Sequence, residues 1–144
     1  MLAEHTVSGQ ARASLAIPVP GRVIWTTALP RRAGLRLDAA VGGDSPDSVA
    51  RLRVGISDER VYESLLEKEI ASGDSARYGW TQVLVSLARY GGPQFSLFYR
   101  PDGRQWRIIL SADPVAGQPR VVYIGRPGID TDADGARRFF KRAR

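Results

Sequence analysis

Short segments in which apolar and polar residues alternate recur along this chain, and they constrain its fold more than any other feature. Alternation over about four to eight residues is typical of strands that bury one face. The clearest example is residues 50–57, where Leu52, Val54 and Ile56 alternate with arginine or glycine. Turn-forming residues separate such segments at intervals of about 8–12 residues, as in sandwiches and barrels. The pattern therefore predicts an all-β protein.

Nine segments are expected to form strands. They are residues 13–19, 22–29, 35–41, 50–57, 60–71, 80–87, 95–99, 105–112 and 120–125. Segment 60–71 contains good helix formers, but its apolar spacing sustains no helical face, so a strand is expected there. Residues 72–77 are expected to form a polar turn. About nine strands suffice for an antiparallel β-sandwich of two packed sheets. Its buried residues should include Trp80, Val83, Val85, Leu87, Leu52, Val54 and Ile56.

The length of 144 residues fits one domain, which at this size buries about 68% of the surface of the unfolded chain. We expect a polar N-terminal segment over residues 1–11, the β-sandwich over 12–129, and an acidic linker with a basic tail over 130–144. In the tail, five basic residues surround Phe139 and Phe140. A short basic helix that contacts an anionic membrane surface, or a frayed end with Phe139 folded back onto the sandwich, would explain this composition.

Missing residue types exclude several kinds of chemistry. The chain contains no cysteine, so it has no disulfide, thiolate metal site or cysteine nucleophile. His5 is the only histidine and lies in a polar stretch, where we expect a solvated side chain rather than a catalytic base. No phosphate-binding glycine loop is present, and the carboxylate pairs have no supporting pocket signal. We therefore expect no enzymatic activity.

The net charge of +6 comes almost entirely from arginine, because Lys68 and Lys141 are the only lysines. Scattered arginines indicate a solvated surface or a preference for phosphate and carboxylate partners. Nucleic-acid binding is not expected, because the chain has neither an RNA-binding aromatic motif nor a recognition helix. No run of 18 apolar residues and no signal-peptide pattern occurs, so neither a membrane-spanning helix nor a secretory signal is expected in this chain.

Several short motifs follow one another in a recognisable order. They are Arg12 to Leu15 with Pro18, the proline-introduced segment 30–37, Trp80 with the alternating residues 83–87, the Tyr-Gly-Gly corner at 88–92, the alternating residues 95–99, and Gly125 to Ile129. This order resembles the jelly-roll modules of the galactose-binding-like superfamily, of the kind found beside bacterial sulfatase-type and membrane-bound enzymes. The chain departs from that pattern at Gln82 and Val83, where an acidic turn is usual.

The resemblance implies a jelly roll and a non-catalytic binding or accessory module. Such a module would recognise a glycan, or pack on a neighbouring enzyme or membrane domain, at the bacterial cell envelope and outside the cytoplasm. The alternative is a structural protein-protein interaction domain without a small-molecule ligand. The sequence leaves both functions open.

Trp106 is the expected ligand contact, because aromatic rings in carbohydrate-binding modules stack on sugars and polar donors surround this one. Arg104 and Arg107 flank it in sequence, and Asp102 lies in the adjoining turn at one end of the sandwich, where loops carry function. The resemblance implies the same role for the other rings in the predicted strands and corners, which are Trp25, Tyr62, Tyr90, Tyr99 and Tyr123. Aromatic residues in strands are more often core residues, so a structural role for Trp106 stays open.

Asp130, Asp132 and Asp134, followed by Gly135, match the opening of a calcium-binding loop. A complete EF-hand is excluded, because its twelfth position, normally glutamate, is Lys141. The three carboxylates therefore predict either a structural calcium site completed from elsewhere or a solvated linker that caps the basic tail. No other cofactor is expected.

Overall fold

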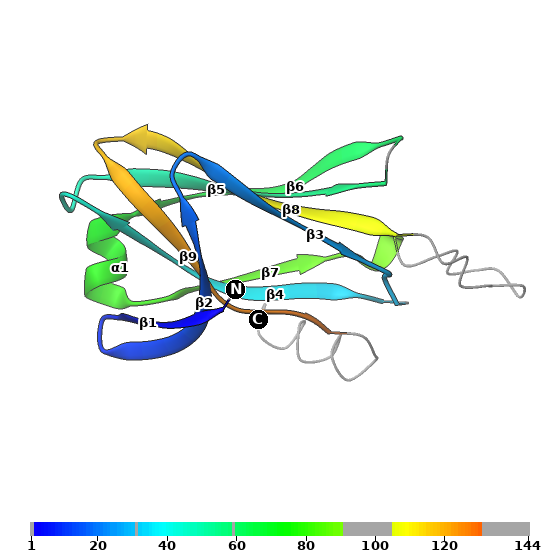
Figure 1. Cartoon of the computed structure of the whole chain (residues 1–144), viewed down its shortest axis with the longest axis horizontal. Helices are drawn as coiled ribbons and strands as arrows, with labels where there is room; N and C mark the ends of the chain where they lie inside the picture. Colours follow the sequence, from blue (N-terminus) through cyan, green and yellow to red (C-terminus); the bar gives the residue numbers. More distant parts are fainter. Residues whose placement is uncertain (1, 31, 59, 91–104, 131–144) are drawn as a thin grey trace, which may run out of the picture.

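The chain folds into two antiparallel sheets packed face to face, as Figure 1 shows. The computed structural model describes residues 2–30, 32–58, 60–90 and 105–130. Sheet A contains, in spatial order, β1 (Ala3–Val7), β2 (Gln10–Pro18), β9 (Pro119–Asp130), β4 (Gly34–Gly43) and β7 (Thr81–Ser86). Sheet B contains β3 (Gly21–Thr27), β8 (Trp106–Ala116), β5 (Val49–Ser57) and β6 (Tyr62–Ala71). The predicted all-β sandwich is confirmed.

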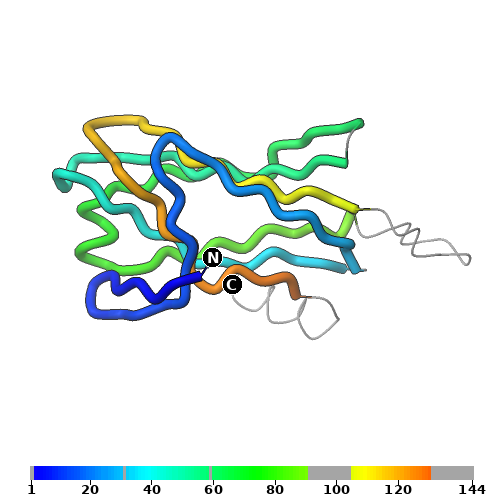
Figure 2. The backbone as a smooth tube through the Cα atoms, viewed as in Figure 1, coloured from blue at the N-terminus to red at the C-terminus, as the bar shows by residue number. Residues whose placement is uncertain are grey.

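The strand order is that of a jelly roll. Consecutive strands alternate between the sheets except at the hairpins β1–β2 and β5–β6, and the path of the chain can be followed in Figure 2. Without β1, the sheets have the orders β2-β9-β4-β7 and β3-β8-β5-β6, two four-stranded sheets formed by interlocked Greek keys. The predicted strand at 95–99 lies outside the described residues, as does the basic tail after residue 130.

Alternation along the strands explains the core. Leu52, Val54 and Ile56 of β5 are each at most 1% exposed and face sheet A. They meet inward-facing residues of both sheets, including Ile17, Leu35, Leu37, Ile108, Leu110, Val122 and Ile124. Each fully buried aliphatic side chain stabilises the fold by about 1.5–3 kcal/mol. The buried positions predicted in β5 and at Val83, Val85 and Leu87 are confirmed.

Two local predictions need correction. The N-terminal residues form β1, which pairs with β2 at the edge of sheet A, instead of remaining outside the sandwich. Trp80, expected in the core, lies half-buried on the outer face of sheet A, beside Tyr123 and over Gly125. The alternation in β7 explains this position, because Val83 and Val85 face inward and even-numbered positions therefore face outward.

The segment expected to be a polar turn forms the helix α1 (Ser72–Tyr78). It has the sequence SGDSARY, which includes a glycine and two serines and has little helix propensity. Tertiary hydrogen bonds hold it instead: the Ser72 amide donates to the carbonyl of Ser48 (2.8 Å), and Ser75 Oγ accepts from the Val41 amide (2.9 Å). Gly79 ends the helix with φ of 85°, a conformation that suits glycine. Among the described residues, no helix is long and apolar enough to cross a bilayer.

Candidate functional site

The predicted ligand residues separate in the structure. Trp106 is 8% exposed and packs edge to face on Tyr90, with ring centroids 5.3 Å apart. So little of the indole is exposed that it offers a sugar no broad stacking face, which favours the structural role that the sequence left open. Arg107 instead points to the outer face of sheet B, where it pairs in register with Thr26. Asp102 and Arg104 lie outside the described residues.

The predicted calcium ligands are only partly described. Asp130 ends β9, and its carboxylate lies 3.6 Å from Nε of Arg36 on the outer face of sheet A. Asp132 and Asp134 lie outside the described residues. In the part of the chain that the structure describes, no three histidine or carboxylate side chains are grouped to hold a metal ion. A calcium site at this position stays a prediction.

On the outer face of sheet B, an exposed aromatic ring lies against the backbone of the neighbouring strand. Tyr62 at the start of β6 is 56% exposed. A Cβ atom placed on Gly55 would lie 2.6 Å from Oη and 2.8 Å from Cε2 of Tyr62. The tip of the ring therefore rests directly on the backbone of Gly55, which only a residue without a side chain permits.

Strand register places the neighbours of this ring in two rows across sheet B. One row contains Thr26, Arg107, Ser57 and Tyr62, and the other contains Ile24, Ile109 and Gly55. Directly paired residues project to the same face, so the two rows form one surface. Ile24 is 45% exposed there, and no other described element packs on this side of the sandwich (Figure 1). We call Ile24, Thr26, Ser57, Tyr62, Arg107 and Ile109 the Tyr62 platform.

The charges beside the Tyr62 platform are balanced. Arg51 lies 2.9 Å from Glu69, and Arg53 lies 3.5 Å from both Glu67 and Asp113. Such exposed pairs contribute little to the stability of a fold. Their effect here is to cancel the charge of the two guanidinium groups. The half of the sheet face that contains them therefore presents no strong electrostatic field to a ligand.

The opposite side of the sandwich is built differently. On the outer face of sheet A, the ring of Tyr123 lies 4.5 Å from the ring of His5 and 6.5 Å from that of Trp80. His5 Nδ1 and the buried Oγ of Ser14 are 2.6 Å apart, and Trp80 Nε1 donates to the carbonyl of Gln10 (3.0 Å). His5, expected to be a solvated tail residue, is thus a half-buried member of β1.

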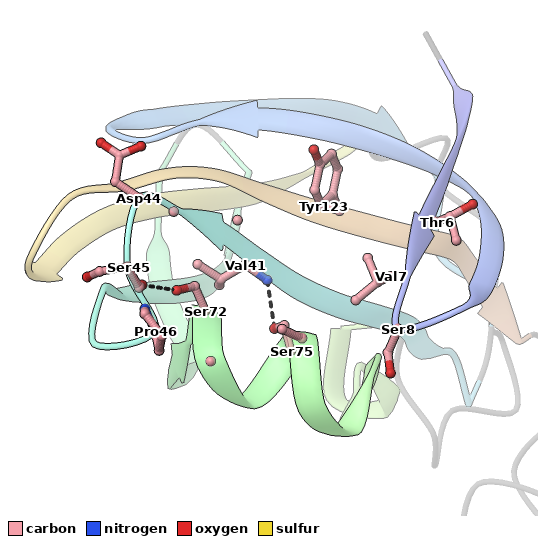
Figure 3. A pocket seen from close by; sticks show the side chains of 14 residues that line it. Thr6, Val7, Ser8, Val41, Asp44, Ser45, Pro46, Ser72, Ser75 and Tyr123 are labelled. Carbon is pink, nitrogen blue, oxygen red and sulfur yellow. Dashed lines mark hydrogen bonds between the residues drawn. The ribbon is translucent and has the colours of Figure 1, made fainter.

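Tyr123 also lines a pocket of about 410 Å³ between β1, α1 and the β4–β5 connection (Figure 3). Its remaining lining is Thr6, Val7, Ser8, Val41, Gly42, Gly43, Asp44, Ser45, Pro46, Ser72, Gly73, Ser75 and Ala76. The lining comes from four separate parts of the chain, so no single sequence motif indicates the pocket. Ligand pockets in proteins commonly have volumes of about 300–1,000 Å³.

The pKa of one titratable group at the end of the sandwich is strongly shifted. Burial, and then a hydrogen bond that the Tyr90 hydroxyl donates to Glu63, raise the pKa of Tyr90 to about 12. Tyr90 contacts the buried ring of Trp106, and Arg89 lies 3.2 Å from the same carboxylate. Nucleophilic or acid–base chemistry near neutral pH would require a lowered pKa. Tyr90 therefore has a structural role at the end of the core.

Two signals in the sequence pointed to these surfaces. Gly55 interrupts the polar side of the most regular strand, and glycine within a strand marks a bulge or a close approach of other atoms. Ser48, Ser72 and Ser75, all at most 7% exposed, lie in segments that read as polar loop or turn. Buried hydroxyls need partners, but the sequence does not show which ones.

Comparison with known proteins supports the fold. No protein-family model and no curated protein sequence matches the chain. Among solved structures, a non-crystalline cellulose specific carbohydrate-binding module, CBM28, superposes with a TM-score of 0.53 at 10% identity, over 90% of this chain and 79% of that one. The sandwich is therefore of the kind seen in that carbohydrate-binding module.

Two further structures superpose less closely. The N-terminal cellulose-binding domain of β-1,4-glucanase C from Cellulomonas fimi gives a TM-score of 0.45 at 15% identity, covering 85% of this chain and 79% of that one. A CBM4 structure gives 0.42 at 11% identity, covering 91% and 78%. None of the three similarities supports the expected association with sulfatase-type enzymes.

Proposed function

We propose that this protein is a non-catalytic glycan-binding module and that a neutral polysaccharide chain lies across the Tyr62 platform. One observation carries the proposal: the exposed ring of Tyr62 rests on the backbone of Gly55 within an open sheet face. A ring held in this way presents a broad apolar surface without burying a cavity behind it. Long chains need such an open face, because they extend beyond the site at both ends.

The chemistry of the platform suits a sugar ring. The C–H face of a pyranose packs on an aromatic ring, and its hydroxyl groups require donors and acceptors at the edges of that contact. Ser57 and Thr26 carry hydroxyl groups in the same row as Tyr62, and Arg107 presents a guanidinium between them. Ile24 and Ile109 extend the apolar surface by one row.

The balanced charges favour a neutral glycan over an anionic one. Arg51 and Arg53 are each held by carboxylates, so they offer no uncompensated positive charge to a uronate or sulfate group. The fold supports a binding function because the module that superposes with a TM-score of 0.53 is specific for non-crystalline cellulose. Amorphous cellulose is accordingly the first probe.

The test is a depletion assay on amorphous cellulose combined with affinity electrophoresis in hydroxyethyl cellulose, xylan and alginate. Wild-type protein should bind a neutral glycan better than alginate, and Tyr62→Ala should weaken that binding by about tenfold or more, the equivalent of about 1.4 kcal/mol. The matched control is Tyr78→Ala, because Tyr78 is 70% exposed on α1 and away from the platform.

Two results would overturn the proposal. Equal binding by Tyr62→Ala and wild type would remove the platform from the site. Failure of the wild type to bind any of the four polysaccharides would favour the other candidate, a protein-protein interaction domain whose exposed surface is the same sheet face.

A further inference from the structure

We infer that the pocket beside Tyr123 is a second binding site, and that it takes a single neutral sugar residue or the end of a short neutral saccharide. The pocket lies on the side of sheet A, whereas the Tyr62 platform lies on sheet B. The inference goes beyond the proposed function, because it concerns a different surface and a different size of ligand. It does not require that the platform bind a polysaccharide.

The walls of the pocket are fixed by buried hydroxyl groups, so the site is formed before any ligand arrives. Ser48 is fully buried, and its Oγ accepts from the amide of Gln118 at 3.2 Å. The Ser72 side chain donates to the carbonyl of Ser45, which fastens α1 to the β4–β5 connection (Figure 3). Ser75 Oγ accepts from the Val41 amide and fastens the same helix to β4.

Backbone contacts complete this scaffold. The amide of Gly73 donates to the carbonyl of Pro46 (3.1 Å), and the Ser48 amide donates to the carbonyl of Ser45 (3.1 Å). Each lining segment is therefore held by its neighbours. A preformed site loses less conformational entropy on binding than a site that must be ordered by its ligand.

The lining combines apolar and hydroxyl groups in the way that a sugar requires. Gly42 and Gly43 of β4 line the pocket, and the ring of Tyr123 lies beside Gly42: a Cβ atom on Gly42 would lie 3.7 Å from Tyr123 Cε2. Val7 and Ala76 supply further apolar surface. Thr6 and Ser8 of the β1 hairpin add polar residues to the lining, on the side away from the β4–β5 connection (Figure 3).

The charge of the lining selects against ions. Asp44 is the only ionisable carboxylate among the lining residues, and Arg120 holds both of its oxygens, with Nε 2.6 Å from Oδ1 and the terminal nitrogen 2.9 Å from Oδ2. That pairing raises the pKa of Arg120, chiefly through the hydrogen bond. No lysine, arginine or histidine lines the pocket, so a phosphate or sulfate group would find no partner charge. One paired carboxylate is also too little for a metal ion.

The size agrees with a small saccharide. A volume of about 410 Å³ is at the lower end of the range of about 300–1,000 Å³ for ligand pockets. The pocket is flanked by α1 on one side and by the β1 hairpin on another, so it is more confined than the open face of sheet B. One or two sugar rings fit this description.

The test is a two-dimensional NMR titration of the ¹⁵N-labelled full chain with glucose, galactose, xylose and cellobiose. At least one sugar should give saturable shifts at the amides of Gly42, Gly43 and Ala76. Ala76→Phe, which fills the pocket from an exposed position of α1, should weaken the affinity by about tenfold or more. The matched control Arg77→Phe adds the same ring at the next helical position, outside the lining, and should leave the affinity unchanged.

The outcomes separate the two sites. Tyr62→Ala should leave the shifts at Gly42 and Ala76 intact, because these residues lie on the other side of the sandwich. If no sugar shifts the pocket amides, or if Ala76→Phe and Arg77→Phe behave alike, the pocket is not a saccharide site, even where wild-type protein still binds amorphous cellulose. If the pocket shifts appear and the wild type binds none of the four polysaccharides, the proposal for the Tyr62 platform fails alone. A Tyr123→Phe variant, which keeps the ring and removes its hydroxyl, should retain most of the affinity if the ring acts by stacking.

Discussion

Two glycines in this molecule each lie beneath an aromatic ring on the outer face of a sheet. One of the two rings is fixed by further contacts with the protein, and the other stays exposed. On sheet A, a Cβ atom on Gly125 would lie 3.1 Å from Cζ3 of Trp80. That indole is fixed at its other edges by the hydrogen bond to Gln10 and by the edge contact with Tyr123. On sheet B, Tyr62 rests on Gly55 but stays 56% exposed.

The difference shows that a glycine beneath a ring does not by itself decide what the ring does. The remaining contacts of the ring decide it. Where the polar atom of the ring and a second edge are bound by the protein, as for Trp80, the ring becomes part of the structure. Among the described residues, Tyr62 makes no side-chain hydrogen bond, so its outward side stays available to a ligand.

The largest expected effect comes from a ring that is wholly enclosed. Trp106→Ala should lower the free energy of unfolding by about 3–5 kcal/mol, because it empties a large core volume next to Tyr90. Tyr62→Ala should lower it by less than about 1 kcal/mol, since most of that side chain already faces water. Urea denaturation of the two variants measures both values. Similar losses for the two variants would break the distinction between enclosed and exposed rings.

A pair of identical substitutions sharpens the comparison of the two glycines. Gly125→Val should cost about 1–3 kcal/mol, because the valine meets an indole that cannot move away without losing its bond to Gln10. Gly55→Val should cost less than about 1 kcal/mol, because the obstructing atoms are the far end of an exposed tyrosine. The Gly55→Val variant should nevertheless lose affinity for amorphous cellulose, because the valine side chain displaces the ring of Tyr62 from the backbone on which it rests. Thermal melts and depletion assays give, for each of the two variants, the change in stability and the change in affinity for amorphous cellulose.

A third comparison concerns Tyr90, a ring held by its hydroxyl group. Its pKa of about 12 in the folded state exceeds the usual value of 10, so folding favours the neutral form. The corresponding stability is fully present below about pH 10 and should be lost as the pH rises from there towards 12. Tyr90→Phe should remove this part of the pH dependence and cost about 1 kcal/mol at neutral pH through the lost hydrogen bond to Glu63.

Absorbance titration near 295 nm follows the ionisation of all five tyrosines, so the difference between wild type and Tyr90→Phe isolates the ionisation of Tyr90. Glu63→Gln should lower the pKa of Tyr90 only in part, because burial is the larger cause of the shift and remains in place. An unchanged value in Glu63→Gln would exclude the carboxylate as a contributor.

Much of the fold was predictable because its strands obey one simple rule. The alternation in β5 identified the strand and its inward face before any contact was known. The same rule, continued backwards from Val83, also places Trp80 on the outer face of sheet A. The prediction that Trp80 is buried failed because the size of the side chain was given more weight than its position in the alternation.

Other parts of the structure depend on contacts that the sequence does not display. The helix α1 forms because Ser48 and Val41 bind its first residues, and these partners come from distant segments. The exposure of Tyr62 likewise depends on the register between β5 and β6, which shifts by one residue after Val54. Gly55 was visible as an irregularity, but which ring covers it was not. The pocket beside Tyr123 could not be predicted, because four separate chain segments, Tyr123 included, meet there.

The place of β9 in sheet A has a consequence for how the molecule is made. β9 is the last described strand in sequence, yet it lies in the interior of its sheet, between β2 and β4, where Ile17 meets Val122. Sheets that depend on pairing between remote segments close slowly, because a long loop must be ordered before the contacts stabilise it. On a translating ribosome, β2 and β4 would both wait with open edges until residue 119 and those after it emerge. The module should therefore fold only after nearly all of its described residues have been synthesised, and chains stalled before β9 should remain sensitive to protease.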